Sequence, residues 1–145
     1  MTMGASADRN VRKSAIAGTW YPGRPSELTR AIAEFLSHVP STKVDGRLVG
    51  LISPHAGYIY SGQTAAYAYK QLEGLNFDIV AIVSPMHRMY AGPVLVNDCG
   101  YYETPLGLVE VDRGLVDALG RQISLSHTDW DDEHSLEIQL PFLQH

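Results

Sequence analysis

Apolar residues recur at helical spacing in the first third of the chain. A stripe with a period close to 3.6 residues predicts an amphipathic helix over 27–38. The members of this stripe are Leu28, Ile32, Phe35, Leu36 and Val39. Ser26 lies where a helix N-cap is expected, and Pro40 follows the stripe and is expected to end the helix.

Two short apolar runs, 47–53 and 78–84, read RLVGLIS and DIVAIVS, and a proline follows each of them. Continuous apolar runs of this length are typical of strands that are buried on both faces, as in parallel sheets. Between them, residues 61–74 are rich in Ala and Gln and predict a helix. The order strand, helix, strand predicts a right-handed βαβ unit. The fold class expected is therefore α/β, with a mostly parallel central sheet flanked by helices.

The rest of the chain alternates between strand-like and helix-like patterns. Strands are predicted over 93–98, 104–112 and 123–129. Asp112 is expected to cap a helix over 113–119. A last helical pattern opens at 131, and Pro141 within it is expected to kink or end the helix. The inward positions of this pattern are Leu136, Leu140 and Leu143.

Composition and charge narrow the class of protein. The chain has 145 residues, of which 45% are hydrophobic, and a formal net charge of −5. A hydrophobic share of this size is typical of globular domains. The negative charge argues against binding to nucleic acid or to anionic membranes. No apolar run approaches the roughly 20 residues that a membrane-spanning helix needs, so we expect neither a nucleic-acid partner nor a membrane.

The start of the chain and its cysteine content indicate the compartment. Residues 1–13 are polar and predict a disordered tail without a signal peptide. Cys99 is the single cysteine, which excludes an internal disulfide and fits a reducing, cytoplasmic compartment. Because Cys99 has no His or Cys at metal-ligand spacing, it is interpreted as a buried or incidental thiol.

Two histidines follow the two predicted parallel strands. His55 comes after SerPro at the end of the first run, and His87 comes after SerProMet at the end of the second. Ligands bind at the carboxyl edge of open α/β sheets, so the two imidazoles are expected to converge there. Such a pair suits a metal or a proton-transfer site, although a metal needs at least one further ligand. The alternative is that both are polar loop residues.

A second polar cluster, AspGluHisSer, occupies 132–135. Glu133 or His134 could supply an acid/base group or orient a ligand histidine, whereas charge spacing alone favours a charged helix N-terminus. Tyr58 and Tyr60 could hydrogen-bond a substrate, although packing is the more common role of tyrosine. The chain has no P-loop, GxGxxG, GxSxG or HExxH motif, which removes the commonest phosphate, dinucleotide, serine-hydrolase and zincin interpretations.

Five motifs, in order, resemble the Memo family, known in bacteria and archaea as the AmmeMemoRadiSam system protein B type. They are AGTWYPG (17–23), SPHAGYIYSG (53–62), SPMHR (84–88), ETPLG (103–107) and DDEHSLEIQLPFLQ (131–144). The resemblance implies a fold like that of class III extradiol ring-cleavage dioxygenases, which use non-haem Fe(II). The family domain is about twice this long, so residues 14–145 are expected to be its N-terminal portion. The last segment is apolar and periodic, and a segment of this kind normally packs against another part of a protein.

The resemblance also implies roles for single residues. His55 and His87 match two histidines of the family's metal site, with iron expected first and copper or zinc as alternatives. Glu133 and His134 match its Glu-His-Ser motif and are expected to be catalytic. Trp20 matches one of an aromatic pair and, with Tyr58 and Tyr60, is expected to contact substrate. The family's third metal ligand is a downstream cysteine, which Cys99 does not match.

Three functions stay open from the sequence. The first is an oxidoreductase-like or metal-binding protein with a dioxygenase-like cleft, in which His55 and His87 bind the metal ion. The second is a non-catalytic module that binds a protein or peptide in the same cleft, because the family includes a member that docks phosphotyrosine peptides. Family members also occur alongside radical-SAM and AMMECR-type proteins, which are expected partners, and a homo-oligomer is a further expectation. The third is a hydrolase, which no nucleophile motif supports.

Overall fold

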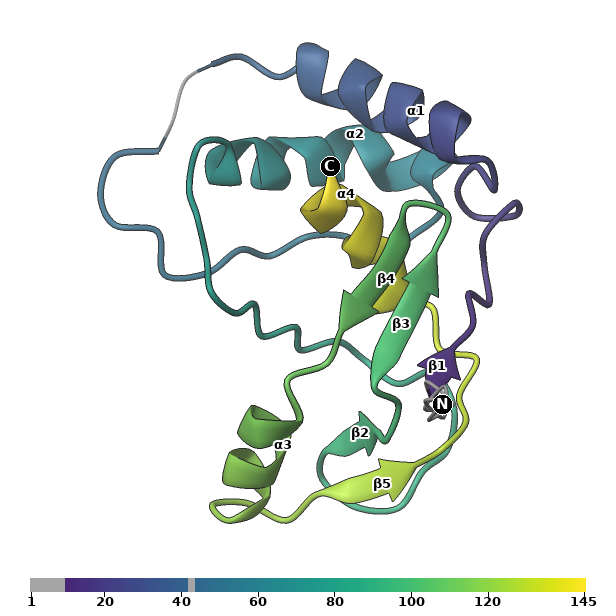
Figure 1. Cartoon of the computed structure of the whole chain (residues 1–145). Coiled ribbons are helices and arrows are strands. Elements are labelled where there is room, and N and C mark those ends of the chain that lie inside the picture. Colours follow the sequence, from purple (N-terminus) through teal and green to yellow (C-terminus); the bar gives the residue numbers. More distant parts are fainter. Residues whose placement is uncertain (1–9, 42–43) are drawn as a thin grey trace, which may run out of the picture.

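Helices and two small sheets form a mixed α/β fold (Figure 1). The computed structural model describes residues 10–41 and 44–145. In these residues the helical elements are α1 (Pro25–Ser37), α2 (Tyr58–Tyr69), η1 (Lys70–Leu72), α3 (Arg113–Gly120), η2 (Glu137–Gln139) and α4 (Leu140–Gln144). The strands are β1 (Val11–Arg12), β2 (Leu95–Asn97), β3 (Tyr101–Thr104), β4 (Gly107–Glu110) and β5 (Ser126–Thr128). The α/β class is therefore confirmed.

The hydrophobic core lies where α1, α2 and α4 meet (Figure 1). Helices α1 and α2 run side by side, and α4 packs on α2. The helices approach closely at Gly62, because a Cβ atom there would lie 2.6 Å from the ring of Phe35. The buried core residues are Ile16, Tyr21, Leu28, Ile32, Val39, Tyr58, Ala65, Ala66, Ile138 and Phe142.

Helix α1 confirms the predicted amphipathic helix, with a different start. Leu28 and Ile32 are fully buried, as the stripe requires. The helix begins at Pro25 rather than Glu27, and Arg24 takes the N-cap position that was expected for Ser26. A proline is favoured in the first turn of a helix, where its missing N–H leaves no bond unmade. Pro25 therefore sets the start without any side-chain cap.

The two apolar runs expected to be parallel strands are not strands. Residues 47–53 and 78–84 belong to neither sheet and make no backbone–backbone hydrogen bond with another described residue. The predicted βαβ unit, and a central sheet built on it, are therefore wrong for the described chain. The physical reason is that a strand exists only through a neighbour that pairs with its backbone. The helix between the runs is confirmed as α2, which begins earlier, at Tyr58.

The strands that do form make two small sheets. In one, β1 pairs parallel with β3, which pairs antiparallel with β4; in the other, β2 pairs parallel with β5. The predicted strands over 93–98, 104–112 and 123–129 contain β2, β4 and β5. Helix α3 is confirmed with its cap, because Oδ1 of Asp112 accepts a 2.9 Å hydrogen bond from the N–H of Leu115.

Both ends of the described chain differ from the sequence predictions. The disordered tail expected over 1–13 is wrong from residue 10 onward, because Val11–Arg12 forms β1 and Arg12 is buried; residues 1–9 lie outside the described part. The helix expected from 131 starts only with η2. Pro141 does not end it but lies in the first turn of α4, where proline is tolerated. No helix in the described ranges is long and apolar enough to cross a membrane.

Candidate metal centre

Three histidines from three distant segments meet at one place. His55 and His87 follow the two apolar runs, as predicted, and His134 lies in the turn before η2. One ring nitrogen of each lies within 4.8 Å of those of the other two. The ring centroids are 5.3 Å apart for His55–His87, 5.8 Å for His55–His134 and 4.5 Å for His87–His134, which are stacked. The convergence of His55 and His87 was predicted from the sequence, and the structure adds His134 to the cluster.

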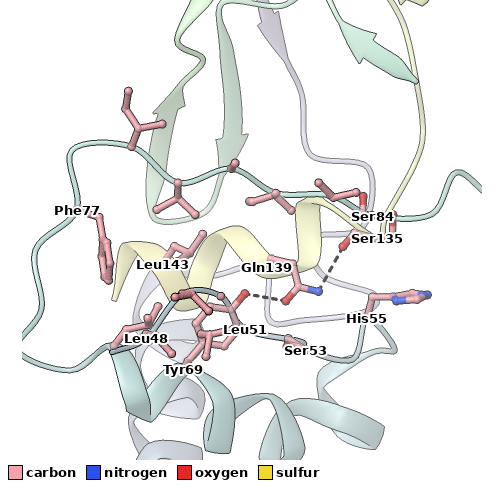
Figure 2. Close-up of a pocket in the computed structure, with 18 of the residues that line it drawn as sticks. Leu48, Leu51, Ser53, His55, Tyr69, Phe77, Ser84, Ser135, Gln139 and Leu143 are labelled. Carbon is pink, nitrogen blue, oxygen red and sulfur yellow. Dashed lines mark hydrogen bonds between the residues drawn. The ribbon is translucent and has the colours of Figure 1, made fainter. Parts of the chain in front are cut away.

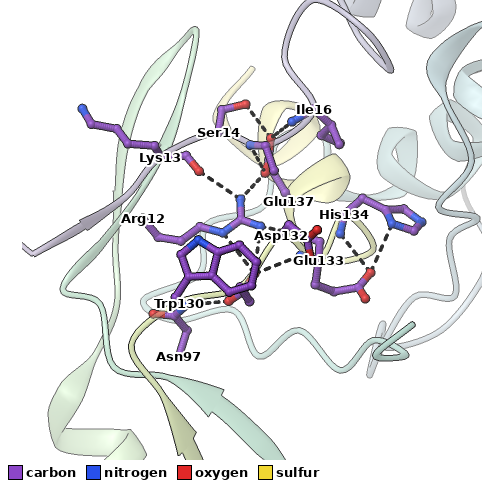
Figure 3. Close-up of polar contacts among 12 residues, drawn as sticks. Arg12, Lys13, Ser14, Ile16, Asn97, Trp130, Asp132, Glu133, His134 and Glu137 are labelled. Atoms are coloured by element: carbon purple, nitrogen blue, oxygen red, sulfur yellow. Dashed lines mark hydrogen bonds and ion pairs between the residues drawn. The ribbon is translucent and has the colours of Figure 1, made fainter. Parts of the chain in front are cut away.

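Glu133 contacts two residues of the histidine cluster, and Figure 3 shows its contact with His134. Its carboxylate accepts hydrogen bonds from the backbone N–H of His87 (2.6 Å), His134 (2.9 Å) and Ser135 (2.8 Å). The same carboxylate lies 2.9 Å from Nδ1 of His87. Burial would raise the pKa of Glu133, but the hydrogen bonds outweigh it and lower the pKa to about 2. Glu133 is therefore a fixed anion at neutral pH.

The surroundings of His134 lower the pKa of its ring and so favour the neutral form. Burial lowers its pKa, and the nearby His87 and His55 add to this effect. Glu133, whose carboxylate lies 3.3 Å from Nδ1 of His134, raises the pKa by less. A neutral imidazole keeps one nitrogen lone pair available, which is the form that binds a metal ion.

A buried arginine fixes the turn that carries Glu133 and His134 (Figure 3). The guanidinium of Arg12 donates to Oδ1 of Asp131 (2.9 Å) and to the backbone carbonyl of Glu133 (2.6 Å). Asp131 in turn accepts the N–H of Glu133 at 3.1 Å. Arg12 also pairs with Glu137, whose side chain is fully buried. Arg12 therefore fixes the backbone segment 131–137, which carries Glu133 and His134.

Two polar side chains of the last segment, Ser135 and Gln139, hydrogen-bond the loops that carry His55 and His87; Figure 2 shows where these two side chains lie. The hydroxyl of Ser135 donates to the carbonyl of Pro85 at 2.6 Å, two residues before His87. The amide of Gln139 donates to the carbonyl of Pro54 at 3.1 Å, next to His55. One short segment therefore supplies His134 and fixes the backbone that presents the other two histidines.

The three aromatic residues expected to contact substrate lie in different surroundings. Trp20 lies against the ring of His134, with centroids 4.2 Å apart, and is 38% exposed. Tyr58 is buried in the core, and its hydroxyl donates to the carbonyl of Ile138 at 3.1 Å. Tyr60 is 85% exposed. The structure thus brings Trp20 to the histidine cluster, Tyr58 to the core and Tyr60 to the surface.

The sequence interpretation missed the residues that support the cluster. Asp131, Ser135 and Gln139 lie inside the DDEHSLEIQ segment, whose polar positions were a usable signal. No sequence pattern pointed to Arg12, because it lies in the segment 1–13 that was predicted to be disordered. Cys99 is buried, as predicted, and is not a member of the histidine cluster. His127 is exposed and pairs with Asp98, outside the cluster.

Comparison with known proteins gives one consistent family. The family model described as Memo-like protein matches residues 12–145. A MEMO1 family protein of Nitrosopumilus maritimus is 37% identical over 141 residues, which cover 92% of this chain and 51% of that protein. MEMO1 family proteins of Pyrobaculum aerophilum and Methanocaldococcus jannaschii are each 38% identical, over 93% of this chain and 52% and 51% of their own lengths. The chain spans about half the length of these curated relatives.

Proposed function

This chain belongs to the Memo family, and we propose that it binds one divalent transition-metal ion through His55, His87 and His134. The observation that carries the proposal is the convergence of three imidazole nitrogens within 4.8 Å from three separate segments. Three protein ligands with further positions open to water or substrate are typical of catalytic metal sites. Here His134 is proposed as a ligand, in place of the acid/base role expected from the sequence.

The surroundings of the histidines fit a metal ion. A ligand histidine almost always has its second ring nitrogen bound to a carboxylate or carbonyl, and Nδ1 of His87 faces Glu133 at 2.9 Å. Two nitrogens bound at about 2.1 Å to one tetrahedral ion lie about 3.4 Å apart. From their present separation of up to 4.8 Å, the ring nitrogens therefore need to approach one another by up to about 1.4 Å. The side chain of His87 is 46% exposed and has room to move.

The three imidazole ligands limit which metal ions the site can bind. Neutral imidazoles suit iron, copper and zinc, and disfavour calcium and magnesium, which prefer oxygen ligands. We propose iron first, in line with the resemblance to extradiol dioxygenases. A bound Fe(II) would supply a centre at which oxygen and a bidentate aromatic substrate can meet. In that case Glu133 orients His87 and balances the positive charge, while Trp20 forms one wall of the site.

Metal content tests this proposal. The purified protein is stripped with chelator, incubated in turn with Fe(II), Zn(II) and Cu(II), desalted and measured by plasma mass spectrometry. We expect about one equivalent in the wild type, and a large loss in His55→Ala and His87→Ala. His127→Ala is the matched control, because this exposed histidine lies outside the cluster, and it should keep full metal content. Equal metal content in all four proteins would exclude the site.

A second candidate function is docking of a peptide at the same surface without chemistry. Trp20 is 38% exposed and Tyr60 is 85% exposed. Both lie beside Gly57, because a Cβ atom added there would be 3.3 Å from the carbonyl oxygen of Trp20 and 3.8 Å from the ring of Tyr60. Exposed aromatic side chains are common anchors of peptide binding. Binding of a phosphotyrosine peptide is measured by titration calorimetry. Affinity that survives loss of both His55 and His87 but is lost in Trp20→Ala favours this function over the metal site.

A further inference from the structure

Two apolar segments line one open slot, together with Gln139 and Leu143 of the last helical segment (Figure 2). Residues 48–54 read LVGLISP and residues 79–85 read IVAIVSP, with no charged side chain in either. A cavity of about 370 Å³ lies between them, and Val49 and Val83 are among its lining residues. Val49 is 91% exposed and Val83 is 98% exposed. Large apolar side chains left this open to water mark a surface that another chain covers.

The backbone of both segments is also unpaired. Within residues 10–41 and 44–145, no backbone–backbone hydrogen bond involves 48–52 or 79–83. Their sequences are nevertheless those of strands buried on both faces. A surface that accepts an added β-strand has two properties. It exposes apolar side chains, and it presents a row of backbone N–H and C=O groups that are not yet paired with another strand.

We infer that this slot receives an extended, apolar strand from a polypeptide equivalent to the half of the Memo domain that this chain does not match. The relatives are about twice as long as the matched region, since the chain covers 51% and 52% of two of them. They therefore carry about as much chain again. The residues that line the slot include no carboxylate, ammonium or guanidinium group. Its occupant is consequently apolar on the faces that enter it.

The slot is continuous with the proposed metal site. His55 lies at the end of one segment and lines the cavity, and His87 lies two residues after Pro85, which also lines it. A strand that pairs with both segments fixes the backbone from which these histidines project. Tighter metal binding in the occupied state follows, and this consequence alone depends on the proposed function. Strand docking itself does not depend on a metal.

The test is strand docking measured in the presence of chelator. The full chain is co-expressed with the unmatched part of the Nitrosopumilus maritimus relative and, separately, with that of the Pyrobaculum aerophilum relative. We expect a one-to-one complex with at least one of them. Hydrogen exchange should show amides of 48–52 and 79–83 slowing at least about tenfold in the complex, as new backbone hydrogen bonds require.

Variants of matched chemistry locate the contact. Val83→Lys places a charge in the slot and should weaken the complex at least about tenfold, because a buried unpaired ammonium is costly. Val44→Lys makes the same change at a residue that is 78% exposed and does not line the cavity, so it should leave the affinity unchanged.

Three results would overturn the inference. The first is that neither fragment forms a complex. The second is that Val83→Lys and Val44→Lys bind equally well. The third is that the chain alone forms a homodimer in which 79–83 is protected, since the slot would then belong to a second copy. Because all samples contain chelator, failure of the metal proposal alone leaves the docking result unchanged.

Discussion

Glu133 is the residue on which the geometry of the histidine cluster depends most. Its carboxylate contacts the backbone of His87, His134 and Ser135 as well as the ring of His87. It therefore joins two segments that are 46 residues apart in sequence. The sequence placed Glu133 at the site as an acid/base group, an assignment that stays a prediction. The contacts support a positioning role for Glu133. Its low pKa keeps the carboxylate ionised at neutral pH, and the ionised carboxylate holds the backbone and ring of His87 in place.

We predict that Glu133→Gln lowers metal affinity by about 10–100-fold, the usual cost of losing the carboxylate that orients a ligand histidine. The amide can no longer accept at both oxygens, so one of its contacts with His87 is lost. Affinity is measured by competition with a chromophoric chelator.

Asp132→Asn is the control for Glu133→Gln. Asp132 is the neighbouring carboxylate, and it forms an exposed pair with Arg88 rather than contacting a histidine. We expect its removal to leave metal affinity within about twofold, as for an exposed ion pair. Equal losses in the two variants would mean that charge alone, and not the orientation of His87, explains the effect.

Among the elements, those with a local signal were predictable and those that need a distant neighbour were not. The apolar stripe of α1 and the Asp112 cap of α3 are properties of a few adjacent residues, and both are confirmed. The runs 47–53 and 78–84 carry the composition of strands but lack a pairing partner in the described chain. Strand β1 was missed because it forms only by pairing with the distant β3. The side chain of Arg12 is likewise held by Asp131 and Glu137, which lie 119 and 125 residues away.

The packing of α1 on α2 gives a prediction about Gly62. Gly62→Ala places a methyl group where the ring of Phe35 now lies, 2.6 Å from the nearest ring atom. We expect a loss of about 1–3 kcal/mol from overpacking, reduced by up to about 1 kcal/mol because alanine favours helix. Urea unfolding measures this. The double variant with Phe35→Leu should lose less than the sum of the two single variants; additive losses would contradict the close approach.

The buried ion pair between Arg12 of β1 and Glu137 of η2 predicts how the stability of the fold depends on pH. Glu137 is fully buried; burial raises its pKa, but hydrogen bonds from Ser14, Ala15, Tyr21 and Arg12 lower it below the ordinary value of 4.5. The folded protein therefore binds this proton less readily than the unfolded chain. The stability that Glu137 contributes is complete above about pH 4.5 and is lost as pH falls through its lower folded pKa.

Replacement of Glu137 tests that link. Glu137→Gln should cost about 3–5 kcal/mol at pH 7, because it leaves part of a buried ion pair without its partner. The difference from wild type should narrow below about pH 4.5, when measured by urea unfolding over a pH series. Glu27→Gln is the control, since this exposed carboxylate pairs with Arg24 on the surface. A difference that stays constant from pH 7 to pH 3 would contradict the role of the ionised carboxylate.

In the molecule as a whole, the start and the end of the described chain meet at the proposed metal centre. Arg12 near one end holds the turn of Glu133 and His134 near the other. Family membership could be predicted from five ordered motifs, and the pairing of His55 with His87 from their repeated positions after apolar runs. His134 as a third ligand could not be predicted, because its approach depends on contacts between segments that only the folded chain brings together.

The most direct measurement is X-ray absorption at the zinc edge of the zinc-loaded protein, because it counts and identifies the ligands of the ion. We predict scattering from three imidazoles at about 2.0–2.1 Å, falling to two in His134→Ala. An unchanged spectrum in His134→Ala would contradict the three-histidine site. So would a sulfur at about 2.3 Å, which would mean that Cys99 leaves its buried position to bind the metal.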